Sequence, residues 1–149
     1  MNPTIHLNQT CIDVCNRLLR GELSAVATYN QVIDKFTDEP AVNELKRIRG
    51  EHVSSVGRLQ RHIQDLGGRP DTDAGARGAF TTALQGTANL LGENSAISMI
   101  QRGEKHGEND YEDALAEDEV MPGCKEIIRR ELLPRIKRHI ATLDQLGKG

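Results

Sequence analysis

The chain has very few aromatic residues. Trp is absent, and two Tyr and two Phe give an aromatic content of only 3% in 149 residues. A hydrophobic core must therefore come from Leu, Ile, Val and Ala, which favours packed helices over a β-sandwich. The shortage of aromatics and the formal net charge of −3 also argue against a nucleic-acid-binding groove. The composition predicts an all-α protein that does not bind nucleic acid.

Long apolar runs and the features of a secretory leader are missing as well. No apolar stretch approaches the roughly 20 residues that a membrane-spanning helix needs. Residues 1–10 lack the basic start and the apolar stretch of a signal peptide. We therefore expect a cytoplasmic protein that does not enter a membrane.

The cysteines do not form the pattern of a disulfide-stabilised domain, because there are only three of them and the number is odd. Cys11 and Cys15 are one helical turn apart, and Cys124 is distant in the sequence. We interpret all three as small core residues, with a metal or redox role as the less favoured alternative.

Apolar residues recur at helical spacing in four segments of the chain. The pattern predicts helices over about 8–36, 40–66, 95–118 and 123–146. The crossover of about 67–94 breaks this rhythm, although its few large apolar residues predict one short helix. A connection of this length joins helices that are not antiparallel neighbours. The sequence thus predicts a single domain, residues 1–149, built as a four-helix bundle.

A glutamate stands near the middle of each predicted helix, in a recurring local sequence. Arg-Gly-Glu occurs three times, and a fourth, imperfect copy is Arg-Arg-Glu; the glutamates are Glu22, Glu51, Glu104 and Glu131. Tyr29 follows Glu22 at the same spacing as Tyr111 follows Glu104. These matches indicate an internal repeat of two helical hairpins.

The apolar neighbours of Glu22 and Glu104 place both side chains on the inner faces of their helices, so we expect both to be buried. Glu51 and Glu131 are different, because each has an arginine four positions away. Such spacing is typical of exposed ion pairs on a helix surface. For these two glutamates the inward and the surface positions both remain open.

Carboxylates that cluster away from water repel one another and lose their hydration, so their charge must be compensated. Two divalent cations would do this. Inward-facing arginines, Arg58 and Arg138, would do it through a buried ion-pair network. Protonation of some of the carboxyl groups is the third way, and the sequence allows all three.

Four helices, a long crossover and a central glutamate on each helix make nearly the whole chain resemble the ferritin-like superfamily. It is most similar to a family of small bacterial ferritin-like proteins of unknown function. The resemblance implies an up-down-down-up bundle whose first and third helices are antiparallel. It also implies a dinuclear iron or manganese site held by Glu22, Glu51, Glu104 and Glu131. Beside such a site Tyr29 and Tyr111 would be hydrogen-bond donors or redox-active neighbours, although a tyrosine at helical spacing more often serves packing.

The sequence departs from the di-iron pattern of this superfamily at two positions. That pattern has a histidine three residues after two of the glutamates, where this chain has Ser54 and Pro134. On a regular helix, His52 points about 100° away from the glutamate before it. His62 and His139 lie about 16 Å and about 12 Å along the axis from the glutamates of their helices, so no histidine is an obvious substitute. Pro134 should also disturb the fourth helix.

We predict a non-catalytic structural, stress-associated or partner-binding module whose buried centre contains Glu22, Glu104, Arg58 and Arg138. The alternative is a dinuclear iron or manganese protein that acts in oxidation, peroxide handling or metal storage. A hydrolase has little support, because the chain lacks a nucleophile elbow and a phosphate-binding glycine-rich loop. By analogy with ferritin-like bundles we expect a homodimer, while the protein partner and any enzymatic activity stay open.

Overall fold

The computed structural model describes residues 3–73 and 93–148, and the regular secondary structure of these residues is helical. The predicted all-α class is therefore confirmed for this part of the chain. The short helix expected in the crossover falls mainly on residues outside the described ranges. The described elements are α1 (Pro3–Val32), the 3-10 turn η1 (Ile33–Lys35), α2 (Glu39–Asp65), α4 (Glu93–Ala116), α5 (Pro122–Ile127), the π turn η2 (Ile128–Leu132) and α6 (Leu133–Lys148).

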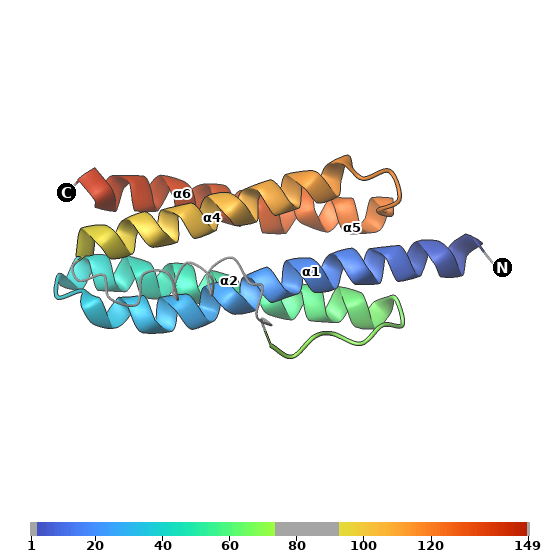
Figure 1. Ribbon diagram of the computed structural model, residues 1–149, viewed down its shortest axis with the longest axis horizontal. Helices are drawn as coiled ribbons and strands as arrows, with labels where there is room; N and C mark the ends of the chain where they lie inside the picture. The colour runs from blue at the N-terminus through green and yellow to red at the C-terminus, as the bar shows by residue number, and fades with distance from the viewer. Residues whose placement is uncertain (1–2, 74–92, 149) are drawn as a thin grey trace.

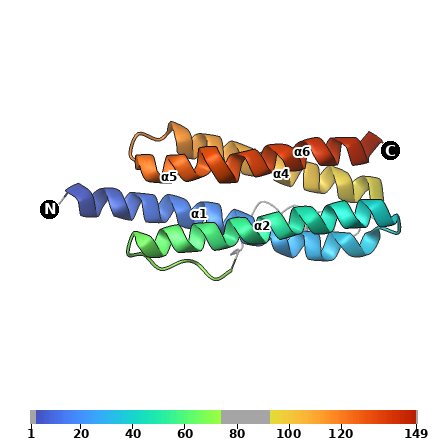
Figure 2. The same cartoon turned by 180° about the vertical axis from the view of Figure 1, so that it is seen from behind.

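Four long rods of helix lie side by side in two hairpins. Figure 1 shows α1 beside α2, and α4 beside the continuous rod of α5, η2 and α6. Figure 2, from behind, shows the same pairs. The helices α2 and α4 run in one direction and α1 and α6 in the other, and α1 contacts α4 across the two hairpins. The long axis of every rod therefore follows the length of the molecule.

The ends of α2 follow from its terminal residues. Asp38 caps the first turn, where its carboxylate accepts a hydrogen bond of 3.1 Å from the backbone N–H of Ala41. Pro40 fits this first turn because the missing N–H would have no partner within the helix. At the other end Gly67 takes a left-handed backbone conformation with a φ of 84°, which glycine adopts without strain.

The predicted disturbance of the fourth helix takes the form of the π turn η2. Pro134 is the second residue of α6, and its ring would clash with the carbonyl of Arg130 in a regular α-helix. The preceding turn is wider instead, and the N–H of Leu133 bonds to the carbonyl oxygen of Ile128. Glu131 lies within this wide turn.

The hydrophobic core is divided into two apolar clusters along the length of the bundle. One contains Leu19, Leu59 and Tyr111, and the other contains Ala25 and Ile48 among its members. Along the sequence of each rod, buried polar residues stand between the residues of one cluster and those of the other. They include Glu22 on α1, His52 and Ser55 on α2, Glu104 on α4 and His139 on α6. The fold thus places a polar layer at mid-bundle with apolar packing on both sides.

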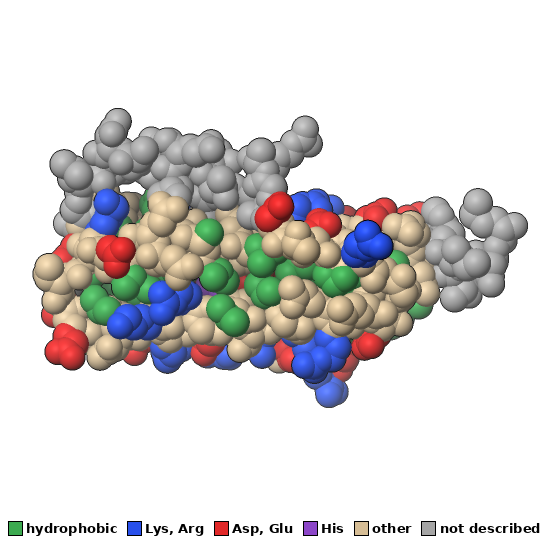
Figure 3. Space-filling model, turned by 90° about the horizontal axis from the view of Figure 1, so that it is seen from below, with side chains coloured by type: hydrophobic (Ala, Val, Ile, Leu, Met, Phe, Trp, Pro, Cys, Tyr) green, Lys and Arg blue, Asp and Glu red, His purple; other side chains and the backbone are tan. Residues whose placement is uncertain are grey.

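On the face shown in Figure 3, hydrophobic side chains form a strip along the middle, and acidic and basic side chains are mixed around it. This mixture agrees with the small net charge of the chain. Among residues 3–73 and 93–148, no helix combines the length and the apolar character needed to cross a membrane.

Candidate functional site

One histidine connects the two glutamates that the sequence predicts to be buried. Glu22 is 4% exposed and Glu104 is fully buried, so both lie inside the bundle as expected. His52, on α2, lies between them. Its Nδ1 is 2.5 Å from Oε2 of Glu22, and its Nε2 contacts Oε1 of Glu104. A single imidazole ring therefore joins a carboxylate of α1 to a carboxylate of α4.

A second buried histidine extends this arrangement to a third carboxylate. His139, on α6, has its Nδ1 3.2 Å from Oε2 of Glu104 and its Nε2 2.8 Å from Oε1 of Glu51. The centroids of the His52 and His139 rings are 4.7 Å apart. Acids and imidazoles thus alternate in the order Glu22, His52, Glu104, His139 and Glu51. We call these five residues the carboxylate–histidine centre.

The two tyrosines complete the hydrogen bonding of the buried glutamates in a reciprocal way. The hydroxyl of Tyr111, on α4, donates to Oε1 of Glu22 at 2.6 Å. The hydroxyl of Tyr29, on α1, donates to Oε1 of Glu104 at 3.1 Å. With the histidine contacts, every carboxylate oxygen of these two glutamates has a partner. This satisfies groups whose burial would otherwise be costly.

The electrostatics favour opposite charges within the carboxylate–histidine centre. Burial alone lowers the pKa of His52, but the carboxylates of Glu104 and Glu22 outweigh burial and raise this pKa to about 10. Burial alone raises the pKa of Glu104, but His52 and His139 outweigh it and lower this pKa to about 2. His52 is consequently an imidazolium and Glu104 a carboxylate at neutral pH.

The tyrosines keep their protons under the same conditions. Burial is the largest cause that raises the pKa values of Tyr29 and Tyr111 well above 10, and the nearby carboxylates raise them further. Both hydroxyl groups therefore remain hydrogen-bond donors to the centre.

Glu51 connects the buried centre to the surface. Its side chain is 28% exposed and also accepts a bond of 3.2 Å from Nη1 of Arg47, the surface pair expected from the spacing. Burial raises the pKa of Glu51, but His139, Arg47 and Arg138 together outweigh burial and lower it. Arg138 is exposed and acts on Glu51 rather than on the fully buried glutamates.

The structure differs from the predicted centre at Glu131 and Arg58. Glu131 lies on the π turn, is 37% exposed, and accepts a bond of 3.1 Å from Nε of Arg58. Arg135 is 4.0 Å away from the same carboxylate. Histidines, not arginines, face the buried glutamates. An imidazole is short and carries a nitrogen on each side, so it fits between two carboxylates. The longer side chain of Arg58 extends instead to the partly exposed carboxylate of Glu131.

Sequence reasoning missed both histidines because it compared each one only with the glutamate of its own helix. The useful signal was that each histidine stands three or four residues from the buried residues before and after it on its helix. On α2 the buried series is Leu45, Ile48, His52, Ser55, Leu59 and Ile63, and on the fourth rod it is Leu132, Ile136, His139 and Leu143. A histidine at such a position is on the inner face.

The donor atoms of the centre are also suitable for a metal ion. The nitrogen and oxygen donors of His52, Glu104 and His139 lie within 4.8 Å of one another, and all three residues are buried. Imidazole and carboxylate together suit iron, manganese and zinc. An ion at this position would have to displace one of the two protons that the His52 ring carries as an imidazolium.

Comparisons with known proteins identify the family of the chain. The model of the family described as a domain of unknown function (DUF2383) matches residues 10–117. This match includes Glu22, His52 and Glu104 and ends before α5. The comparisons with curated proteins and with solved structures gave no match. The matched segment is well over half of the sequence, and the chain belongs to the DUF2383 family.

Proposed function

We propose that this chain is a ferritin-like bundle protein that acts as a non-catalytic structural, stress-associated or partner-binding module, with ion pairs between histidines and glutamates at its centre. The observation that carries this proposal is the position of His52, whose two ring nitrogens contact carboxylates of two different helices. In a dinuclear ferritin-like protein, metal cations compensate the central glutamates. In this chain the imidazolium of His52 compensates Glu22 and Glu104 instead.

The ferritin-like part of the proposal rests on helix direction and on the reciprocal tyrosine bonds. α1 and α4 run in opposite directions and contact each other, as the resemblance of the sequence implies. Each tyrosine donates to the central glutamate of the other helix. This exchange is what two related hairpins packed about a two-fold axis would produce.

The charge balance supports a centre that is complete without an added ion. Three carboxylates, those of Glu22, Glu104 and Glu51, face two imidazoles and the guanidinium of Arg47. The pKa of His52, raised to about 10, makes this ring a cation between the two fully buried carboxylates at neutral pH. The side chains of Glu22, Glu104, His52 and His139 are at most 4% exposed, which leaves little access for a substrate.

A metal centre is the second candidate function, because the donors of His52, Glu104 and His139 lie so close together. Glu22 and Glu51 would supply further oxygen ligands, and Glu131 would not, since it pairs with Arg58. Bound iron or manganese would supply one-electron chemistry for oxidation or peroxide handling. The protein residues would hold the ion, and the two tyrosines would orient the carboxylates.

Elemental analysis separates the two candidates. Protein purified without chelators and then treated anaerobically with Fe²⁺ or Mn²⁺ should contain neither metal in stoichiometric amount. The matched variant carries Glu22→Gln and Glu104→Gln, which keep the side-chain shape and remove both charges. Stoichiometric iron or manganese in the wild type that disappears in this variant would replace the ion-pair proposal with the metal centre.

A further inference from the structure

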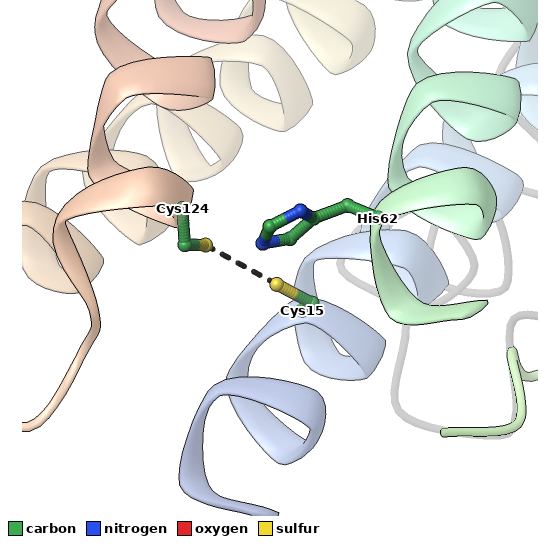
Figure 4. A group of neighbouring side chains, drawn as sticks. All are labelled: Cys15, His62 and Cys124. Atoms are coloured by element: carbon green, nitrogen blue, oxygen red, sulfur yellow. Dashed lines mark hydrogen bonds between the residues drawn. The ribbon is translucent and has the colours of Figure 1, made fainter. Parts of the chain in front are cut away.

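Two cysteines and a histidine from three helices meet at a place outside the carboxylate–histidine centre. Figure 4 shows Cys15 of α1, His62 of α2 and Cys124 of α5 with their side chains directed toward one another. The two Sγ atoms are 3.2 Å apart, and the three donor atoms lie within 4.8 Å of one another. We call these three residues the Cys–His cluster.

The Cys–His cluster is distinct from the centre at mid-bundle. Cys15 precedes Glu22 by seven residues, a distance of about 10 Å along α1. His62 follows His52 by ten residues, a distance of about 15 Å along α2. A ligand of one site would therefore not contact the other.

The imidazole of His62 has an unsatisfied nitrogen. Its Nε2 is buried and forms no hydrogen bond with any of the described residues. A buried polar atom without a partner is unfavourable and uncommon in folded proteins. The residue as a whole is only partly buried, although this nitrogen is inaccessible to solvent. A ligand between the ring and the sulfur atoms would satisfy this nitrogen.

The two thiols are available to bind such a ligand. Both side chains are buried and neither cysteine is in a disulfide. Their sulfur atoms are 3.2 Å apart, and both side chains point toward the imidazole of His62. A metal ion that enters the cluster would displace the thiol protons, because the thiolate is the form of cysteine that binds metals.

We propose that Cys15, His62 and Cys124 bind a thiophilic metal ion, Zn²⁺ or Cu⁺. Thiolate and imidazole are the ligands that these ions prefer, whereas Mg²⁺, Ca²⁺ and Mn²⁺ prefer oxygen. Donors of a tetrahedral zinc ion, at roughly 2.3 Å for sulfur and 2.0–2.1 Å for nitrogen, are about 3.5 Å apart. The two sulfur atoms of the cluster, 3.2 Å apart, are close to this spacing, and the nitrogen donor of His62 lies within 4.8 Å of both. Cu⁺ accepts three ligands, and Zn²⁺ takes a fourth, such as water.

The fold gives such an ion a structural consequence. The helices α1 and α2 belong to one hairpin, and α5 begins the last rod of the other. An ion held by all three would fix the start of that last rod, just after the turn that follows α4, to the first hairpin. Metal binding would then add to the stability of the folded state.

Titration of the reduced chain with Zn²⁺ alone, under anaerobic conditions and against a colorimetric chelator, tests the proposal. The expected result is one equivalent of tightly bound Zn²⁺, with the same measurement repeated for Cu⁺ to decide between the two ions. Cys15→Ala, Cys124→Ala and His62→Gln should each lose stoichiometric binding. Cys11→Ala is the matched control, because Cys11 is buried one turn earlier on α1 and its Sγ contacts the backbone of Met121 and Glu119. This control should bind normally.

Protection of the thiols gives a second measurement that needs no variant. Zn²⁺ should slow the alkylation of Cys15 and Cys124 in the wild type much more than the alkylation of Cys11. Binding should also persist in the variant with Glu22→Gln and Glu104→Gln, which separates this site from the centre at mid-bundle. The proposal would be overturned by a wild type that takes up neither ion, or by uptake that survives the loss of both Cys15 and Cys124. Preferential oxidation of these thiols to a disulfide in air, with Zn²⁺ present, would also overturn it.

Discussion

Replacement of His52 by leucine should lower the free energy of unfolding by about 3–5 kcal/mol. The reason is that Glu22 and Glu104 would each lose the cation that now contacts them, while both remain buried. A buried carboxylate that loses its cation keeps its desolvation cost, and the neutral tyrosine hydroxyls that still donate to Glu22 and Glu104 do not replace the lost attraction between charges. Urea denaturation near pH 6, with comparison of midpoint and slope, measures this loss.

Two surface variants are suitable controls for the His52 prediction. His106 is also a helical histidine near a carboxylate, 3.4 Å from Asp110, but its side chain is 59% exposed. Arg58 contacts Glu131, and the side chains of this pair are 26% and 37% exposed. His106→Leu and Arg58→Leu should each change the free energy of unfolding by no more than about 1 kcal/mol. A loss of about 3–5 kcal/mol from Arg58→Leu, together with no such loss from His52→Leu, would mean that Arg58 and not His52 is the central cation.

A second substitution tests whether the loss comes from stranded charge rather than from a cavity. Glu104→Gln removes one of the two charges that lose their contact with the His52 ring in His52→Leu. The double variant should therefore be less destabilised than the sum of the two single variants, by on the order of 1–3 kcal/mol. Additive losses would mean that His52 stabilises the fold by packing alone.

The stability of the protein should fall as the pH rises from neutral to alkaline values. The pKa of His52 is about 10 in the folded protein against an ordinary value of 6.5. A group whose folded pKa is raised contributes stability that is complete below pH 6.5 and is lost as the pH rises through about 10. The expected loss over this window is several kcal/mol, since each unit of pKa difference corresponds to roughly 1.4 kcal/mol.

The acid side has the opposite sign. The pKa of Glu104 is lowered from 4.5 to about 2, so its contribution is complete above pH 4.5 and is lost as the pH falls through about 2. The combined contribution of His52 and Glu104 to the free energy of unfolding is therefore greatest between pH 4.5 and 6.5. The measurement is the difference between the pH profiles of the wild type and His52→Leu, because this difference cancels the titration of the cysteine thiols. A difference that stays constant from pH 6.5 to 10 would contradict the raised pKa of His52.

The fold was more accessible from the sequence than the site. Apolar spacing indicated the four helical segments, and Asp38, Pro40 and Gly67 set the ends of α2 by local chemistry. The burial of Glu22 and Glu104 also followed from their immediate neighbours. These features depend on residues within one or two helical turns, so each can be predicted from the sequence of a single helix.

The contacts of the site depend on pairs of helices, and this is why they could not be predicted. His139 lies 88 residues from Glu51, and their contact requires α6 to lie against α2 at one particular rotation. The π turn before Pro134 also inserts an extra residue into the helical turn. Positions after it are therefore rotated by about 100° relative to a regular helix continued from α5. The Cys15–Cys124 contact, across 109 residues, has the same dependence on packing.

The protonation state of His52 is the most direct test of the ion-pair centre. Nitrogen NMR of the imidazole groups at pH 8, assigned with the His52→Leu variant, reports whether each ring nitrogen carries a proton. We expect protons on both Nδ1 and Nε2 of His52, since each nitrogen contacts a carboxylate and the pKa is about 10. A neutral His52 ring at pH 8, with one bare nitrogen, would contradict the account.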